Sequence, residues 1–180
     1  MEFIDIYDED MNYLGYMEKE QAHKEKHWHK SVHICVGDSE NNILVQRRAS
    51  CKSLYPGLWD FSVSGHISSG ETPLQGAIRE FQEELGLPWE FGEIKESFIN
   101  KITLSPDGHE HNEFVYVYLL KKKIDLSKLN LQTEEVAEVK CISLGEFTEL
   151  FNSGKFVPHR ESYIKEVING LSRLTKGEYL

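Results

Sequence analysis

The sequence is poor in cysteine, in cationic residues and in long apolar runs, and each shortage narrows what the protein can be. Three cysteines among 180 residues form no CxxC pair, so disulfides are neither indicated nor excluded. Lys and Arg total 20 against 30 Asp and Glu, a formal net charge of -10. This charge disfavours tight binding to a nucleic-acid polymer, which relies on many cationic contacts. No run of about 18 apolar residues is available to span a membrane, and the acidic start lacks the basic and apolar blocks of an export signal. We therefore expect a cytoplasmic protein that binds neither nucleic-acid polymers nor membranes.

The composition that remains is typical of one folded domain. Hydrophobic residues make up 39% of the chain, with nine Phe, eight Tyr and three Trp, enough for a packed core. The first residues alternate apolar and polar side chains around an acidic turn at Asp8 to Asn12, a pattern that predicts a β-hairpin. The charged, His-rich stretch at 18–30 is expected to be a surface connection. We predict that residues 1–27 pack as a hairpin and connection on a domain formed by residues 28–175.

The rest of the chain alternates between strand and helix patterns. Apolar residues with helical spacing predict a helix that Thr72 caps, with Pro73 in the first turn and Gly86 just beyond its end. Ser143 and Glu146 form a capping box for a second helix, and apolar spacing from 164 to 174 predicts a third. Strands are predicted at 32–36, 43–46, 59–65, 94–104, 113–120 and 136–142. The expected fold class is α+β, a mixed sheet covered by helices.

Three glutamates share one face of the first long helix. Glu80, Glu83 and Glu84 fall within an arc of roughly 100° opposite the apolar stripe, and no Lys or Arg follows any of them by four residues. Clustered carboxylate oxygens suit Mg²⁺, which is usually held by a few carboxylates together with substrate phosphates. The alternative is an ordinary solvated acidic face.

The segment GHISSGETPLQGAIREFQEELGL, residues 65–87, resembles the Nudix box. The resemblance implies a Nudix fold, with a sheet sandwiched between helices, and Mg²⁺- or Mn²⁺-dependent hydrolysis of a nucleoside diphosphate linked to another group. It implies that Glu80, Glu83 and Glu84 hold the metal together with the carbonyl of Gly65. It also implies that Glu71 bonds within the motif, that Arg79 orients a glutamate, and that one of the three metal-holding glutamates, or one from a later loop, activates water. The candidate catalytic residues are therefore Glu83, Glu80 and Arg79. Phe81 stands where the family has an aliphatic residue, and we expect it to affect packing rather than chemistry.

Several polar residues outside the box are further candidates. Arg47, Arg48 and Lys52 form a local basic cluster that could grip terminal phosphates or could be solvated surface charge. One of Glu134, Glu135 and Glu138 could supply an extra ligand or base, and their spacing does not choose among them. The early histidines, His23, His27, His29 and His33, lack a cysteine or carboxylate at a spacing diagnostic of zinc, so we interpret them as exposed. His66, His109 and His111 are better placed to approach the site.

The segment from His29 to His66 is also similar to type I isopentenyl diphosphate isomerase, an enzyme of the same fold. That family uses a cysteine where this chain has Ser64, and a Glu-x-Glu pair where it has His111-Asn112-Glu113. A hydroxyl is a far weaker acid than a thiol, so both departures argue against isomerisation. The leading hypothesis is a Mg²⁺-dependent Nudix pyrophosphohydrolase acting on a small-molecule diphosphate. The alternatives are an isomerase-like enzyme acting on a prenyl diphosphate and a module that senses a nucleotide without cleaving it. The substrate's identity and a homodimeric state are left open.

Overall fold

The computed structural model describes residues 2–90, 94, 96–104 and 111–177. Within them, nine strands form one mixed sheet, and four α-helices accompany it. No helix in this part of the chain is long and apolar enough to cross a membrane. The strands are β1 (Phe3–Tyr7), β2 (Tyr13–Glu18), β3 (Trp28–Gly37), β4 (Asn42–Arg48), β5 (Trp59–Asp60), β6 (Val63–His66), β7 (Glu96–Leu104), β8 (His111–Lys121) and β9 (Val136–Ser143). The helices are α1 (Lys19–Lys24), α2 (Pro73–Leu85), α3 (Leu144–Asn152) and α4 (Glu161–Lys176), and a single 3-10 turn lies at Leu126–Lys128.

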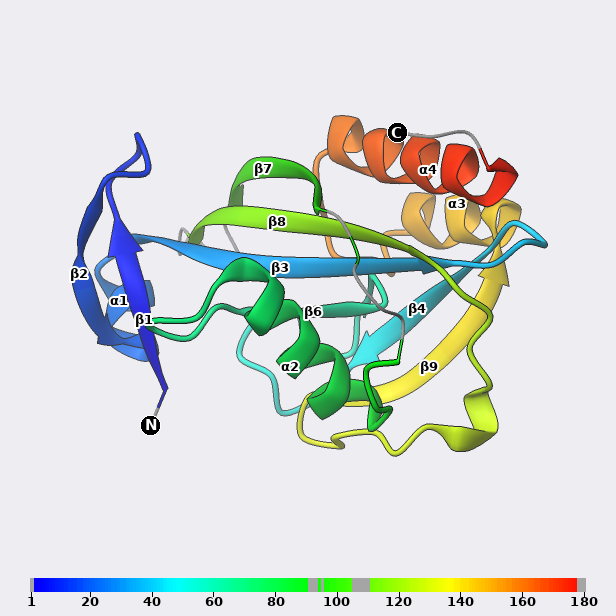
Figure 1. The fold of residues 1–180 in the computed structure, drawn as a ribbon, viewed down its shortest axis with the longest axis horizontal. Helices are drawn as coiled ribbons and strands as arrows, with labels where there is room; N and C mark the ends of the chain where they lie inside the picture. Colours follow the sequence, from blue (N-terminus) through cyan, green and yellow to red (C-terminus); the bar gives the residue numbers. More distant parts are fainter. Residues whose placement is uncertain (1, 91–93, 95, 105–110, 178–180) are drawn as a thin grey trace.

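Strand β3 is the centre of the sheet. It runs parallel to β8 along its length and antiparallel to β6, and its first residues pair with β1. Strand β4 continues the sheet, pairing antiparallel with both β5 and β9. The hairpin of β1 and β2 is joined to the sheet through β1 (Figure 1). The mixed sheet confirms the expected α+β class, and the predicted N-terminal hairpin is present.

Helices cover both faces of this sheet. Helix α2 lies on one face, and α3 and α4 lie on the other (Figure 1). Val32, Ile34 and Val36 of β3 belong to the core cluster under α2, and Cys35 belongs to the cluster under α4. Successive side chains of a strand point to opposite faces, so the end of β3, from Ile34 to Val36, is apolar on both sides of the sheet.

The predicted helices begin and end with the expected caps. The Thr72 hydroxyl accepts a hydrogen bond from the Gln75 N–H, while the Gln75 side chain accepts one from the Thr72 N–H. Gly86 ends α2 in the left-handed conformation with φ of 66°. Ser143 and Glu146 form the second capping box, at the start of α3. The pairing of orphan N–H groups with side chains explains why these ends were readable from sequence.

Two local expectations were wrong. The segment 59–65 is two strands rather than one, because at Ser62 the chain changes its pairing partner from β4 to β3. There the Ser62 hydroxyl donates to the Leu44 carbonyl (2.6 Å) and accepts from the Val36 N–H (2.8 Å), and it replaces ladder bonds. The His-rich segment is not merely a surface connection. It contains α1, whose Ala22 is buried, and the start of β3, where His29 is fully buried.

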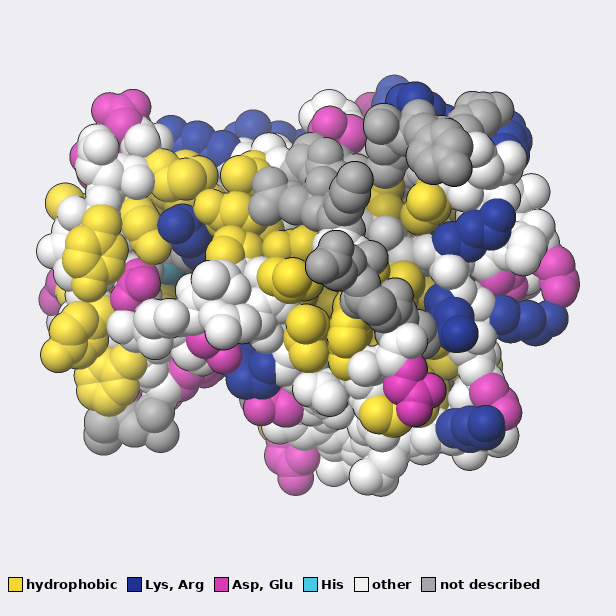
Figure 2. Space-filling model, viewed as in Figure 1, with side chains coloured by type: hydrophobic (Ala, Val, Ile, Leu, Met, Phe, Trp, Pro, Cys, Tyr) yellow, Lys and Arg dark blue, Asp and Glu magenta, His cyan; other side chains and the backbone are white. Residues whose placement is uncertain are grey.

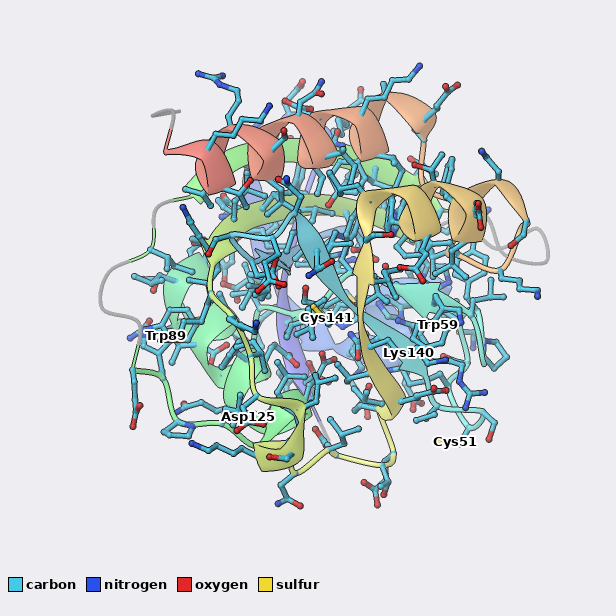
Figure 3. The ribbon with its side chains drawn as sticks, turned by 90° about the vertical axis from the view of Figure 1, so that its right-hand side faces the viewer. Cys51, Trp59, Trp89, Asp125, Lys140 and Cys141 are labelled. Carbon is cyan, nitrogen blue, oxygen red and sulfur yellow. The ribbon has the colours of Figure 1, made fainter. Side chains whose placement is uncertain are left out.

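All three cysteines are free, and only Cys35 is buried. Cys141 lies in the apolar run of β9 but is exposed. Cys51 and Cys141 lie well apart on the surface shown in Figure 3. No pair of these thiols is placed to form a disulfide within the chain.

We expect Gly86→Ala to lower the free energy of unfolding by more than about 2 kcal/mol. The left-handed backbone disfavours any Cβ by about 1–2 kcal/mol, and a Cβ here would also collide with the backbone carbonyl of Asn130. Gly177, which ends α4 with φ of 80°, is the matched control, since nothing described lies within 4 Å of its added Cβ. Gly177→Ala should cost only this backbone contribution, about 1–2 kcal/mol. Equal losses in urea unfolding of the two variants would contradict the steric argument.

Candidate functional site

A cavity of about 580 Å³ opens beside α2. Figure 2 shows a hollow between the N-terminal hairpin and the rest of the molecule, with acidic and cationic side chains along its edge. Of the box residues, Gly65, Arg79, Glu80 and Glu83 line the cavity. Its other walls come from β3, β5, β8, the loop after β4 and the segment that follows α3. The expected catalytic residues are therefore brought together at one edge of the cavity.

Arg79 ties three glutamates of the box together. Its Nε and Nη2 donate to the two carboxylate oxygens of Glu71, both at 2.9 Å, and Nη2 also donates to the His66 carbonyl at 2.8 Å. Its Nη1 donates to Glu80 Oε1 at 2.7 Å and to Glu83 Oε2 at 3.1 Å. A planar guanidinium can satisfy this fixed set of acceptors because its five N–H groups point in set directions. Arg79 thus orients glutamates, as the resemblance implied.

Glu80 lies against the backbone of β6 at Gly65. A Cβ added at Gly65 would overlap the Glu80 carboxylate, so only glycine permits this approach. The Glu80 side chain is 12% exposed and that of Glu83 is 50% exposed. One carboxylate is therefore packed beside the strand while the other reaches the open cavity.

Glu84 is more deeply placed than the other two. It is buried, and its Oε2 accepts from the Gln46 side-chain amide at 3.0 Å and from the Ser64 N–H at 3.3 Å. Gln46 is a site residue that the sequence analysis missed. Its place on β4 just before the two arginines was visible, but no local spacing links it to a residue 38 positions later. It fixes the orientation of the Glu84 carboxylate.

The burial of these carboxylates leaves negative charge without enough compensation. Burial, outweighing the Arg79 contact, and repulsion from Glu83 raise the pKa of Glu80 to about 7. Burial and the Glu80 charge raise the pKa of Glu84 well above its ordinary value. Clustered carboxylate oxygens that resist ionisation together are a donor set suited to a hard divalent cation. The residues present therefore fit the divalent metal that the box implies.

The structure does not keep the three residues of the basic cluster together. Arg48 and Lys52 line the cavity; Arg48 Nε donates to the Leu54 carbonyl at 2.9 Å, and Lys52 forms an ion pair with Glu135. Arg47 does not line the cavity; its Nε lies 3.0 Å from Glu138 Oε2. Successive side chains of β4 face opposite sides of the sheet, so the side chains of Arg47 and Arg48 point in different directions.

Of the three late glutamates, the structure brings Glu135 to the cavity. It lines the wall beside Lys52. Glu138 is engaged by Arg47 and by Lys140 on the outside of β9, and neither it nor Glu134 is among the lining residues. The path of the chain between α2 and β9 therefore places Glu135, and not Glu134 or Glu138, at the cavity. The spacing of the three glutamates in the sequence could not distinguish them.

The interpretation of the histidines as exposed was wrong. Ligand atoms of His23, His29 and His66 all lie within 4.8 Å of one another. The rings of His23 and His111 have centroids 4.7 Å apart, and Glu113 Oε1 lies 3.9 Å from His29 Nε2. These five residues form what we call the histidine cluster. The carboxylate partner that was missing from the local sequence comes from β8, at Glu113.

Two imidazoles of the histidine cluster, those of His23 and His66, are held in the neutral form. Burial, with help from the neighbouring His29 and His111, lowers the pKa of His23 to about 3, and burial lowers the pKa of His66 well below its ordinary value. A neutral imidazole is the form that binds a metal. The other two early histidines are elsewhere. His27 is partly exposed, and His33 Nδ1 bonds to the Tyr163 hydroxyl at 2.6 Å. His109 lies outside the described residues.

Comparisons with known proteins show the family to which the chain belongs. The family model of the NUDIX domain matches residues 27–166. An uncharacterised Nudix hydrolase of Listeria innocua is 34% identical over 131 residues, which cover 73% of this chain and 73% of that protein. An isopentenyl-diphosphate Delta-isomerase of Serratia proteamaculans is 34% identical over 118 residues, or 66% of this chain and 65% of that one.

Solved structures share the fold at low identity. A crystal structure from Deinococcus radiodurans covers 99% of this chain and all of its own, with a TM-score of 0.69 and 20% identity. The NUDIX domain of Shewanella oneidensis NrtR, solved with ADP ribose, covers 81% of this chain and 87% of its own, with a TM-score of 0.56 and 15% identity. These likenesses establish the fold.

We expect the metal-free protein to lose stability as pH falls from 6.5 to about 4, in part because of His33. Burial lowers the pKa of this histidine to about 4 from an ordinary value of 6.5. Above pH 6.5 both folded and unfolded states hold it neutral. Between the two values the unfolded chain binds a proton and the folded one does not. Stability therefore drops by about 1.4 kcal/mol per pH unit for this group. Urea unfolding in EDTA should show a shallower decline for His33→Gln than for the wild type. An unchanged slope would contradict the assignment, and His27→Gln, at a side chain that reaches solvent, is the matched control.

We also expect the histidine cluster to bind one divalent transition-metal ion, because imidazole nitrogens with a carboxylate suit Zn²⁺ and its neighbours. Calorimetric titration with Zn²⁺ should show a site that His29→Gln weakens at least about tenfold. His27→Gln should leave this site intact, as should Glu83→Gln, which alters only the box. Equal Zn²⁺ binding by His29→Gln and the wild type would rule out the site.

Proposed function

The chain belongs to the Nudix family and is a pyrophosphohydrolase acting on phosphoric anhydrides, and from this premise we propose that it cleaves a nucleoside diphosphate derivative with the help of Mg²⁺ or Mn²⁺. The observation that carries the proposal is the set of carboxylates on α2 beside the cavity, with Gly65 and Arg79 holding Glu80 in place. The solved domain with ADP ribose supports a substrate of this class.

Glu80, Glu83 and Glu84 would hold the ion, with the carbonyl of Gly65 as a further oxygen. A divalent ion bound there supplies neutralisation of the diphosphate charge and a lowered pKa for bound water. The protein's own contribution is orientation. Arg79 fixes Glu80 and Glu83, and Gln46 fixes Glu84. Glu83, the most exposed of the three, can take a proton from the attacking water.

The side chains across the cavity complete the substrate site. Arg48 and Lys52 line it and are the cations that would bind phosphate oxygens. Glu135 pairs with Lys52 at the same wall and is the late glutamate that could act as an alternative base. Arg47 faces away with Glu138, so we propose no phosphate contact for it.

An isomerase-like reaction on a prenyl diphosphate is the second candidate. The Serratia relative and the histidine cluster beside the same cavity favour it. Against it, Ser64 holds a hydroxyl where an acidic thiol is needed, and its Oγ is buried. A module that only senses a nucleotide is disfavoured, because every carboxylate of the box is present and oriented.

Chromatographic detection of the cleavage products, such as a nucleoside monophosphate and a sugar phosphate from a nucleotide sugar, tests the proposal over a panel of nucleotide sugars, dinucleotides, nucleoside triphosphates and prenyl diphosphates. We expect Mg²⁺-dependent release from one nucleotide class, reduced about 100-fold or more in Glu83→Gln and Glu84→Gln, because several kcal/mol of transition-state stabilisation depends on the bound ion. Glu149→Gln, at an exposed glutamate of α3, is the matched control and should retain wild-type release.

Silence across the panel, with Mg²⁺ binding intact, would contradict hydrolysis of these substrates and favour the sensing module. Conversion of isopentenyl diphosphate to a product of unchanged mass, lost in Ser64→Ala, would identify the isomerase.

A further inference from the structure

The cavity has a second wall that the proposed hydrolysis does not use. Besides the box glutamates, it is lined by Ser31 and His33 of β3, Asp60 of β5, Glu113 of β8, and His159 from the segment after α3. We call these five residues the polar wall. At about 580 Å³ the cavity is within the range of sites that enclose a whole small molecule. A substrate whose diphosphate lies at the box therefore extends toward the polar wall.

Asp60 and His159 form the most constrained pair in this wall. His159 Nε2 lies 3.0 Å from Asp60 Oδ1, and Asp60 also accepts from the Phe61 N–H at 2.9 Å and lies 3.6 Å from Arg48. Although burial would raise the pKa of Asp60, the hydrogen bond from His159 and the nearby cations lower it well below its usual range. Asp60 is thus an ionised acceptor that fixes one nitrogen of the imidazole.

The backbone brings His159 to this position and packing holds its ring. The Trp59 N–H donates to the Lys155 carbonyl at 2.9 Å, and the Val157 N–H donates to the Trp59 carbonyl at 2.8 Å. Trp59 is itself held from the other side, where Lys140 of β9 lies 4.9 Å from its ring centroid (Figure 3). The His159 ring stacks on Phe61 at 5.6 Å. Both the segment after α3 and the ring orientation are therefore fixed before any substrate arrives.

His159 retains an unused hydrogen-bonding atom. The residue is 5% exposed, and its Nδ1 is buried without a hydrogen-bond partner among the residues that the structure describes. A buried imidazole nitrogen that lacks a partner is costly unless a ligand supplies one. His159 lines the cavity, so a bound molecule that displaces the side chains covering Nδ1 can supply this partner.

The chemistry of the polar wall selects among substrates. Glu113 accepts from the Ser31 hydroxyl at 2.6 Å, and this leaves other carboxylate lone pairs open, as at Asp60. Two carboxylates repel phosphate oxygens, so a diphosphate held by Arg48 would point away from them. An apolar prenyl group would strip these groups of water and return no hydrogen bonds. Ring hydroxyls can both donate to carboxylates and accept from an imidazole, as acidic residues do for ribose hydroxyls elsewhere.

We propose that His159 is a specificity-determining residue and Asp60 the residue that positions it, together selecting a polyhydroxylated group, such as a ribosyl or sugar ring, on the far side of the diphosphate. This inference rests on the proposed hydrolase function for the placement of the diphosphate. It adds the residues that recognise the group attached to the diphosphate.

Binding of monophosphates to the wild-type protein tests the preference without turnover. We expect ribose 5-phosphate to bind at least about tenfold more tightly than dimethylallyl phosphate in calorimetry, a difference equivalent to one good hydrogen bond. His159→Phe keeps a flat ring and removes both nitrogens, so it should abolish the preference. His159→Gln should restore part of it, and His27→Phe, outside the cavity, should not change it. Equal binding of the two monophosphates by the wild type, or no binding of either, would overturn the proposal whether or not the variants fold.

Steady-state kinetics with ADP-ribose provides a second readout. His159→Phe and, less strongly, Asp60→Asn should raise KM about tenfold and leave kcat within about threefold, because the lost contact is remote from the reacting phosphorus and is made equally in the ground and transition states. A fall in kcat with unchanged KM would place His159 in the chemistry and overturn the specificity role. Cleavage of the diphosphate without a ribose preference contradicts this inference alone, whereas a ribose preference without any cleavage contradicts the hydrolase proposal alone.

Discussion

The burial of like charges on one side of α2 is the constraint on which the site depends. Glu80 and Glu84 are one helical turn apart and both are largely shielded from solvent, where an isolated carboxylate is strongly disfavoured. The fold tolerates them by surrounding them with donors. Arg79 serves Glu80, and Gln46 and the Ser64 N–H serve Glu84. These donors do not neutralise all the negative charge of the cluster. The arrangement is therefore suited to a divalent cation.

The sheet supplies the rigidity that this arrangement requires. Gly65 lies on β6 and Gln46 on β4. Ser62, just before β6, ties the two strands together because its hydroxyl donates to the Leu44 carbonyl of β4, and α2 packs against β6 and β3. Because the same short strand provides the close backbone approach for Glu80 and the N–H for Glu84, the positions of the two carboxylates are linked. A site built on strands and a helix holds its ligands with less freedom than one built on loops.

Three sets of polar side chains lie at or beside the cavity. They are the carboxylates of α2, the histidine cluster and the polar wall, which shares Glu113 with the histidine cluster. Hard cations prefer the first set and borderline transition metals the second. The two sets therefore need not compete for one ion, and each can contribute separately to binding a charged, hydroxylated molecule.

What the sequence by itself determined is local. Within α2 the spacing places Glu80, Glu83 and Glu84 on one face, the caps at Thr72 and Gly86 follow from orphan backbone groups, and the box as a whole indicated the family. Contacts three or four residues apart on a helix are fixed by helical geometry alone. Only the tertiary structure decided the rest. It joined His23, His29 and His66 with Glu113, turned Arg47 away from Arg48, and brought His159 to Asp60, 99 positions earlier in the chain. Such pairings depend on strand register and on which segment lies along which edge of the sheet, and no local spacing encodes them.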